Sequence, residues 1–339
     1  MQSYIQQVHV CSASPITMKA QEYIQKKLNA FKEPVPVTGE LKGTPEEIVY
    51  ARLMSKKFRK VKAGQQCIDI TKRVVEKAAK EQTPIMVTEC FGGNKLWRFD
   101  EAPEIDWAEL LSLFYFVDWM KYVAAVHKPG MIFDYFSQDI SAERLDNLTR
   151  EEVDTYSRTF RAMIEWVKPY LPDNVSITYR RHREMFEDES KYDVEITEAK
   201  QKYLDEHNGK LPVLDDEMKA RTELNVRLLD GQDKDPMWRE KTELQHQAIF
   251  MTPTLDTYLT FPDMVWTCPT YYEDSIVTGS TKKSMAKFWA GVGAIERSGD
   301  SYNDIILTPK QLRAAKFDWE EVNLVGLEGK NFTKIRVLK

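Results

Sequence analysis

The chain has 339 residues, of which 42% are hydrophobic and 11% aromatic, so it is long enough to bury a sizeable core. The chain has only 14 glycines and 15 prolines, which excludes a collagen-like or Gly/Pro-rich chain. Its charged residues are of both signs and interspersed, which excludes wholesale disorder. The net charge of −5 is unevenly distributed along the chain, because residues 1–80 hold 15 Lys and Arg against 7 Asp and Glu.

Cysteine usage and apolar runs indicate the compartment. The four cysteines lie far apart without a Cys-x-x-Cys pair, so we expect neither a disulfide framework nor a zinc site. Residues 1–19 have no apolar run followed by a small-residue cleavage pattern, so we expect no signal peptide. The apolar stretch 107–126 is interrupted by Glu109, Asp118 and Lys121, which favours a buried helix over a membrane span. We therefore predict a cytoplasmic protein that does not enter a membrane.

Residues 1–82 are predicted to form a helical, basic region. Thr44-Pro45-Glu46-Glu47 is a capping box that predicts a helix to about Phe58, and apolar spacing predicts another over 65–80. The segment between these helices has the densest basic cluster of the chain, namely Lys56, Lys57, Arg59, Lys60 and Lys62. Such a cluster is either a solvated helix end or a surface that binds nucleic-acid phosphates.

Residues 83–186 are predicted to form a Rossmann-like core. Short apolar runs at 84–91, 131–136 and 175–179 predict strands. A helix capped by Asp106 and another after the Thr149 capping box separate these strands. The order β-α-β-α-β predicts an α/β fold with a parallel sheet and right-handed crossovers.

Residues 187–339 are predicted to be a helical insertion followed by an α+β region that completes the fold. The segment 184–250 is charged and helical in pattern, and one helix is expected to open at Asp215. Further strands are expected within 255–277 and at three short apolar runs, 288–295, 305–307 and 332–338. The Thr308 capping box predicts a short helix between the last two runs.

Ligands of an open parallel sheet bind beyond the carboxyl ends of its strands, and this rule selects the first candidate site. Gly93, Asn94, Lys95 and Arg98 follow the first predicted strand. A Gly-Gly turn lets a ligand approach the backbone, and the two cations suit a phosphate or carboxylate, so we expect an anionic small-molecule substrate here. The spacing matches neither a Walker loop nor the Gly-x-Gly-x-x-Gly fingerprint.

The alternative for this loop is structural. Lys95 and Arg98 then pair with Glu101 and Glu104 and fasten the loop without binding a ligand.

The same rule selects residues after the second and third strands. Asp139 is a candidate to bind an ammonium or abstract a proton, and His182 is a candidate acid or base because its ordinary pKa lies near neutrality. Arg180, Arg181 and Arg183 match phosphate or carboxylate geometry, although an exposed charged turn is the alternative. We expect no metal and no cofactor, because the histidines are dispersed.

Several motifs between residue 91 and about residue 186 occur in a recognisable order. They are Phe91-Gly92-Gly93-Asn94-Lys95, Pro103-Glu104-Ile105-Asp106-Trp107-Ala108-Glu109, Pro129-Gly130, Ser137-Gln138-Asp139 and the stretch from Leu148 to Tyr156. In order and spacing they resemble the isonitrile synthase family, which includes the pyoverdine/dityrosine biosynthesis enzymes. A weaker similarity occurs over 289–293. The chain departs from the family where Ile140 replaces the glycine after Asp139.

The resemblance implies a transferase- or lyase-type biosynthetic enzyme. Enzymes of that family join the amino nitrogen of an aromatic amino acid to a carbon supplied by a pentulose phosphate. The resemblance implies that Lys95 and Arg98 hold the phosphate and that Asp139 lies near the reacting carbonyl or the ammonium. Two alternatives remain open: a nucleic-acid-associated protein that uses the basic 50–80 segment, and a non-catalytic interaction protein with a degenerate site.

Overall fold

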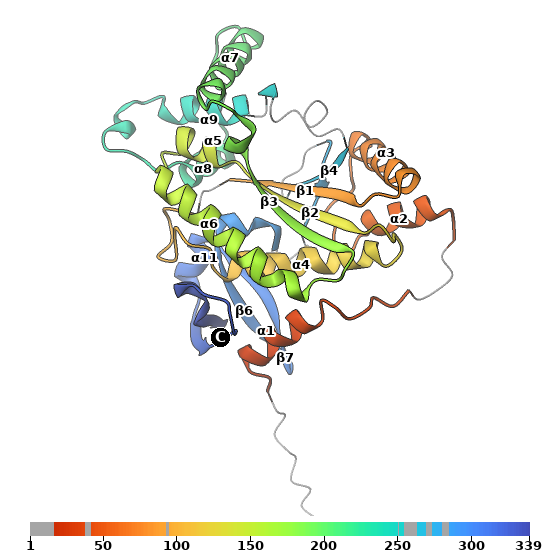
Figure 1. The fold of residues 1–339 in the computed structure, drawn as a ribbon. Helices are drawn as coiled ribbons and strands as arrows, with labels where there is room; N and C mark the ends of the chain where they lie inside the picture. The colour runs from red at the N-terminus through yellow and green to blue at the C-terminus, as the bar shows by residue number, and fades with distance from the viewer. Residues whose placement is uncertain are drawn as a thin grey trace, which may run out of the picture.

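The computed structural model describes residues 17–37, 42–92, 95–249, 251–253, 263–268, 273–279 and 285–339, without the side chains of 217, 221, 224, 285 and 286. The fold contains a five-stranded parallel sheet and a four-stranded mixed sheet, with helices around and between them (Figure 1). The expected α/β fold with a parallel core and a C-terminal α+β region is therefore confirmed.

The parallel sheet has the strand order β3-β2-β1-β4-β5. Its strands are β1 (Ile85–Phe91), β2 (Met131–Ser137), β3 (Val175–Arg181), β4 (Met264–Cys268) and β5 (Ile276–Val277). β1 pairs with β2 and β2 with β3, all parallel, which confirms the predicted β-α-β-α-β unit. The chain then crosses back to place β4 on the other side of β1. The strand order therefore reverses between β1 and β4, and this reversal is the switch point of the sheet.

Helices cover both faces of the parallel sheet. One face carries α3 (Gln65–Glu81), α4 (Trp107–Ala124) and α6 (Arg150–Val167), and the other carries α5 (Asp139–Leu145), α7 (Ser190–Glu206) and α9 (Trp238–Ile249) (Figure 1). Because side chains alternate along a strand, Phe133 and Tyr135 of β2 join the α4 core, whereas Phe136 joins the α7–α9 core. α8 (Asp216–Asn225) packs on α9 and is capped by Asp215, as predicted.

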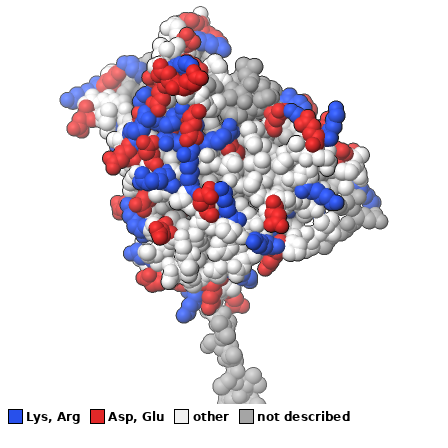
Figure 2. All heavy atoms as spheres, viewed as in Figure 1, with Lys and Arg blue, Asp and Glu red and all other residues white. Residues whose placement is uncertain are grey.

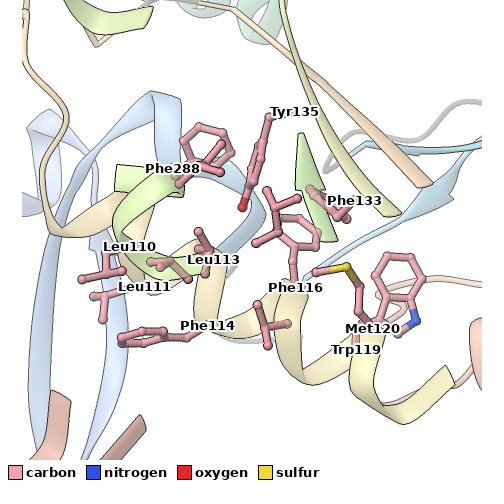
Figure 3. Close-up of a cluster of buried hydrophobic side chains, with 14 of the residues drawn as sticks. Leu110, Leu111, Leu113, Phe114, Phe116, Trp119, Met120, Phe133, Tyr135 and Phe288 are labelled. Atoms are coloured by element: carbon pink, nitrogen blue, oxygen red, sulfur yellow. The ribbon is translucent and has the colours of Figure 1, made fainter. Parts of the chain in front are cut away.

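Helix α4 lies between the two sheets. It contacts β2 on one side and β6 and β7 on the other, and Leu111 and Phe114 have no exposed area. Figure 3 shows its apolar side chains pointing in several directions around the helix. Asp106 caps the helix and Glu109 completes the capping box, as the sequence predicts. Among the described helices, none combines the length and apolar composition needed to cross a membrane.

The mixed sheet has the order β7-β6-β9-β8. Its strands are β6 (Val292–Ser298), β7 (Ser301–Leu307), β8 (Phe317–Glu321) and β9 (Lys334–Leu338), and α11 (Pro309–Ala314) follows the Thr308 capping box. The strand predicted from residue 288 begins at Val292, because η5 (Met285–Ala290) is a 3-10 segment that turns Phe288 into the core. The sequence did not predict β8, an edge strand without a buried side.

The N-terminal region is helical, as predicted. It contains α1 (Ala20–Asn29) and α2 (Pro45–Leu53), followed by α3. α2 ends before Phe58, because Met54 leaves the helical conformation and the chain turns to pack Phe58 against Tyr115 and Trp119. Short 3-10 segments complete the fold: η1 (Lys168–Tyr170), η2 (His182–Met185), η3 (Gln232–Lys234) and η6 (Lys330–Phe332). The division at 82 and 186 stays a prediction.

Candidate functional site

Lys95 lies in the turn after β1, fully buried between two carboxylates at the start of α4. Its Nζ is 2.7 Å and 2.9 Å from the Glu109 oxygens and 3.2 Å from Asp106 Oδ2. Tyr156 of α6 donates a hydrogen bond of 2.8 Å to Glu109. We call these four residues the Lys95 cluster. The expected alternative partner Glu101 binds Arg336 of β9 instead.

The charges of the Lys95 cluster are unbalanced, since one cation faces two acids. Burial raises the pKa of Glu109 to about 7, although Lys95 favours its charged form. Burial alone would lower the pKa of Lys95, but Asp106 and Glu109 outweigh it and the net shift is upward. A proton on Glu109 therefore balances the cluster near neutral pH.

Most of the motifs that carry the family resemblance meet at the Lys95 cluster, whereas Pro129-Gly130 and Ser137-Gln138-Asp139 lie elsewhere. The Phe91 ring lies 6.3 Å from Tyr156 and 5.9 Å from Trp289, measured between ring centroids. The amide of Gly293 donates a hydrogen bond of 3.2 Å to Asp106 Oδ1. Segments up to 187 residues apart in sequence thus converge on one buried ion pair.

Asp139 and the arginines after β3 form a second cluster, the arginine network. Asp139 accepts hydrogen bonds from Arg181 Nε at 2.7 Å and from the Arg183 side chain. Arg183 also binds Glu143 at 2.7 Å and Glu189 at 2.8 Å. Figure 2 shows such basic and acidic side chains interleaved over α5, α6 and α7.

Arg180 points to the opposite face of the sheet from Arg181, because consecutive strand residues alternate. Asp134 holds its guanidinium at 2.9 Å and 2.7 Å. The predicted anion ligands after β3 therefore all have acidic partners, and a substrate anion would compete with those acids.

His182 is buried among the rings of Phe136, Phe186 and Tyr192, at centroid distances of 5.3–5.6 Å. Burial lowers its pKa to about 4, although Asp139 acts in the opposite direction. The imidazole is therefore neutral at physiological pH. A neutral imidazole can accept a proton but holds it weakly.

Arg98 is half-buried beside the Trp97 ring. Burial lowers its pKa to about 10, although Asp146 acts in the opposite direction. This guanidinium is still charged near neutral pH, and a phosphate next to it would offset the cost of burying that charge. Gly93 and Asn94, the other predicted ligands of this loop, lie outside the described residues.

The sequence analysis missed Glu89, an acidic residue in the otherwise apolar strand β1. Glu89 is fully buried and in register with Thr267 of β4, at the switch point of the sheet. The Thr267 hydroxyl contacts one Glu89 carboxyl oxygen and lies 3.1 Å from the Thr88 carbonyl oxygen. Burial raises the pKa of Glu89 to about 8. The available signal was an isolated charge inside a strand predicted to be buried on both faces.

Two other regions bear on function. In the turn after α2, Lys56, Lys57, Lys60 and Lys62 are exposed, and none forms an ion pair within the described part of the chain. A cavity of ≈ 180 Å³ lies between α6 and the loop at 326–329, with Glu104 and Ile105 in its lining. In the described ranges, no group of three or more His, Cys, Asp or Glu side chains is arranged to hold a metal ion.

The fold is similar to a solved structure, the crystal structure of the PvcA protein from Pseudomonas aeruginosa. The TM-score is 0.54 at 13% sequence identity, and the alignment covers 93% of this chain and 98% of that chain. At this identity the likeness establishes a common fold over nearly the whole length. No family model matches the chain, and no curated protein matches it in sequence.

Proposed function

We propose that this chain is a biosynthetic enzyme of the isonitrile synthase type, which acts on an amino group and a phosphorylated pentulose or similar anionic metabolite. The supporting observation is the convergence of most of the family-like motifs on the Lys95 cluster. Each motif resembles the family only loosely in sequence. A shared buried cluster gives a structural reason why these motifs occur together in one chain. The fold similarity to PvcA over most of both chains supports the same proposal.

In this proposal Arg98 holds the phosphate of the sugar. Burial disfavours the charged form of Arg98. The charge of Lys95, in contrast, is already balanced by Asp106 and Glu109. Lys95 then contributes by fixing the turn at 95–98 against α4, so that Arg98 is held at the carboxyl end of β1.

The second wall of the proposed site comes from β2 and β3. In this proposal Asp139 and His182 are the catalytic groups of this wall, and Arg181 and Arg183, which bind Asp139, are further anion ligands. A phosphate would reach Arg183 by displacing Glu143 or Glu189, because these acids occupy its two terminal nitrogens. The reaction needs an uncharged amino nitrogen beside a carbonyl carbon, so the site must also remove a proton from an ammonium group.

The test begins with ligand-induced stabilisation of the full chain. Ribulose 5-phosphate should raise the thermal unfolding temperature, because a ligand at about 100 times its Kd adds about 2.7 kcal/mol. An uncharged pentose should have no effect. Arg98→Ala should abolish the shift, and the matched control Arg297→Ala should retain it, because Arg297 pairs with Glu320 on the mixed sheet.

Turnover is then measured with an aromatic amino acid and ribulose 5-phosphate, and the product is detected by mass spectrometry. Absence of stabilisation by ribulose 5-phosphate would contradict the proposed function. Stabilisation without turnover of any amine would instead favour the non-catalytic protein with a degenerate site.

The exposed lysines after α2 support a second candidate, a nucleic-acid-associated protein. Phosphate contacts by such side chains make binding strongly salt-dependent. Duplex DNA and single-stranded RNA binding should be measured across a salt series with the wild type and with Lys56→Ala/Lys60→Ala. A steep loss of affinity with salt, weakened by the double variant, would support this candidate over the enzyme.

A further inference from the structure

The switch point of the parallel sheet carries a buried acid that the proposed function has not used. In open α/β sheets, ligands bind in the crevice outside the strand ends where the strand order reverses. Here the order reverses between β1 and β4, and Glu89 and Thr267 are register partners on these two neighbouring strands. The same strand, β1, leads directly into the turn that holds Arg98.

Thr267 satisfies only one of the two Glu89 carboxyl oxygens. Its hydroxyl donates to Glu89 Oε2 and also lies 3.1 Å from the Thr88 carbonyl oxygen. The other oxygen, Glu89 Oε1, has no hydrogen-bond partner among the described residues. Burial raises the pKa of Glu89 to about 8, although the Thr267 hydrogen bond acts in the opposite direction.

Glu89 has no compensating cation among the described residues. Within the described part of the chain, no Lys, Arg or His forms an ion pair with Glu89, and the titratable groups near it are Cys90, Tyr115 and Tyr135. Burial raises the pKa of both tyrosines, and the Glu89 charge adds to the rise. All three neighbours are therefore neutral near pH 7 and leave the carboxyl proton in place.

An unpaired carboxyl oxygen lies in the same layer of the fold. Glu89 Oε1 is buried without a hydrogen-bond partner among the described residues, and Ser112 and the Tyr135 hydroxyl interact with each other in this layer. Buried polar atoms are normally paired, so the unpaired Glu89 oxygen is suited to a polar ligand. Figure 3 shows the Tyr135 hydroxyl directed from the sheet toward α4. The rings of Phe91 and Phe288 lie 6.3 Å and 5.7 Å from Tyr135 and make the layer suitable for an aromatic or apolar body.

We propose that Glu89 is a catalytic residue that exchanges a proton with the amino group of the substrate at the switch point between β1 and β4. This inference rests on the proposed function, since it assigns a residue to the amine that the reaction needs.

The substrate arrives as an ammonium ion. Binding converts the neutral Glu89 acid to a carboxylate beside the ammonium and releases one proton to solvent. The ammonium then transfers one N–H proton to the Glu89 carboxylate, which leaves an uncharged amino nitrogen with a free lone pair. Glu89 returns to the neutral form that its buried surroundings favour, and its raised pKa brings the carboxylate closer in basicity to the amine, which makes the transfer easier.

The experiment measures amine binding by calorimetry on the full chain. The probe is 2-phenylethylamine, and 2-phenylethanol is the uncharged control. Because Glu89 has no exposed area, each titration is preceded by long equilibration. The binding heats in two buffers of different ionisation enthalpy give the number of protons released per amine bound. With a Glu89 pKa of about 8, this number should be about 0.9 at about pH 7 and about 0.1 at about pH 9.

Variants assign the effect to Glu89. Glu89→Gln resembles the neutral acid in shape and charge, so it should fold, bind the amine at least about tenfold more weakly and release no proton. Its affinity for 2-phenylethanol should change by less than about twofold. The matched control Glu328→Gln replaces an exposed acid beside the ≈ 180 Å³ cavity and should behave as the wild type.

Three results would each overturn the inference: no amine binding by the wild type, binding without the pH-dependent proton release, or equal amine affinity in Glu89→Gln. The proton release of the wild type tests the role of Glu89 even if the variant fails to fold. If the amine experiments fail while ribulose 5-phosphate still stabilises the chain, only the role of Glu89 is refuted. Normal amine binding without that stabilisation removes the proposed function instead.

Discussion

Replacing Lys95 by Met tests whether the buried cluster holds the strand-end turn. Lys95, Asp106 and Glu109 have side chains 0%, 2% and 0% exposed, so none of the charges is solvated. Met has a similar length and no charge, so Lys95→Met leaves two buried acids without a cation. Removing one partner of a buried ion pair costs about 3–5 kcal/mol, and we expect a loss of unfolding free energy of that size.

The loss should depend on pH in a defined direction. Burial raises the pKa of Glu109 to about 7, which is above its value in the unfolded chain, so stability falls as pH rises toward the folded pKa. Without Lys95 the folded pKa of Glu109 is higher still. The variant then keeps losing stability above pH 7 while the wild type levels off. The difference between them should grow by on the order of 1 kcal/mol from about pH 7 to about pH 8.

Urea unfolding of both proteins at about pH 6, 7 and 8 measures this difference. The control is Lys77→Met, which removes an exposed pair with Asp263 and should cost less than about 1 kcal/mol at every pH. Adding Glu109→Gln to Lys95→Met should recover part of the loss, because one fewer buried charge remains unpaired. A Lys95→Met loss below about 1 kcal/mol, or one that is independent of pH, would refute this reasoning.

Three further predictions concern the core and the switch point. Leu111→Ala in α4 should cost about 2–5 kcal/mol in chemical unfolding, and a change below about 1 kcal/mol would show that the site is not packed. Gly293→Ala should destabilise strongly, because its Cβ would lie 2.4 Å from the α4 backbone, whereas Gly92→Ala meets nothing within 4 Å and should be tolerated. The unfolding free energy of Glu89→Gln should rise relative to that of the wild type by on the order of 1 kcal/mol per pH unit between about pH 5 and 8, because folding raises the pKa of Glu89 in the wild type. Unfolding free energies that change in parallel with pH in the two proteins would contradict a raised pKa.

Local signals account for most of what the sequence predicted. The capping boxes at Thr44, Thr149 and Thr308 and the Asp106 cap are all present, because a capping box is formed by residues three apart. The strand β8 escaped prediction, because an exposed edge strand has no apolar alternation to detect.

The candidate site depended on longer-range information. The sequence placed Lys95 and Arg183 at strand ends but did not identify the acids that pair with them: Lys95 was expected either to bind a ligand or to pair with Glu101 or Glu104. Their acidic partners lie on other elements: Glu109 on α4 and Glu143 on α5. Glu89 was missed for the opposite reason, since its neighbour Thr267 lies 178 residues away and only the strand order brings the two together.

Helix α4 belongs to the packing of both sheets, and this has a consequence for cooperativity. Its residues on one side fill the layer beneath β2, and on the other side β6 approaches so closely that Gly293 leaves no room for a Cβ atom. Detaching the mixed sheet would expose an apolar helix surface that the parallel sheet cannot cover by itself. The parallel core and the C-terminal sheet should therefore melt in one transition, and a chain shortened before β6 should lose the core as well as the missing strands.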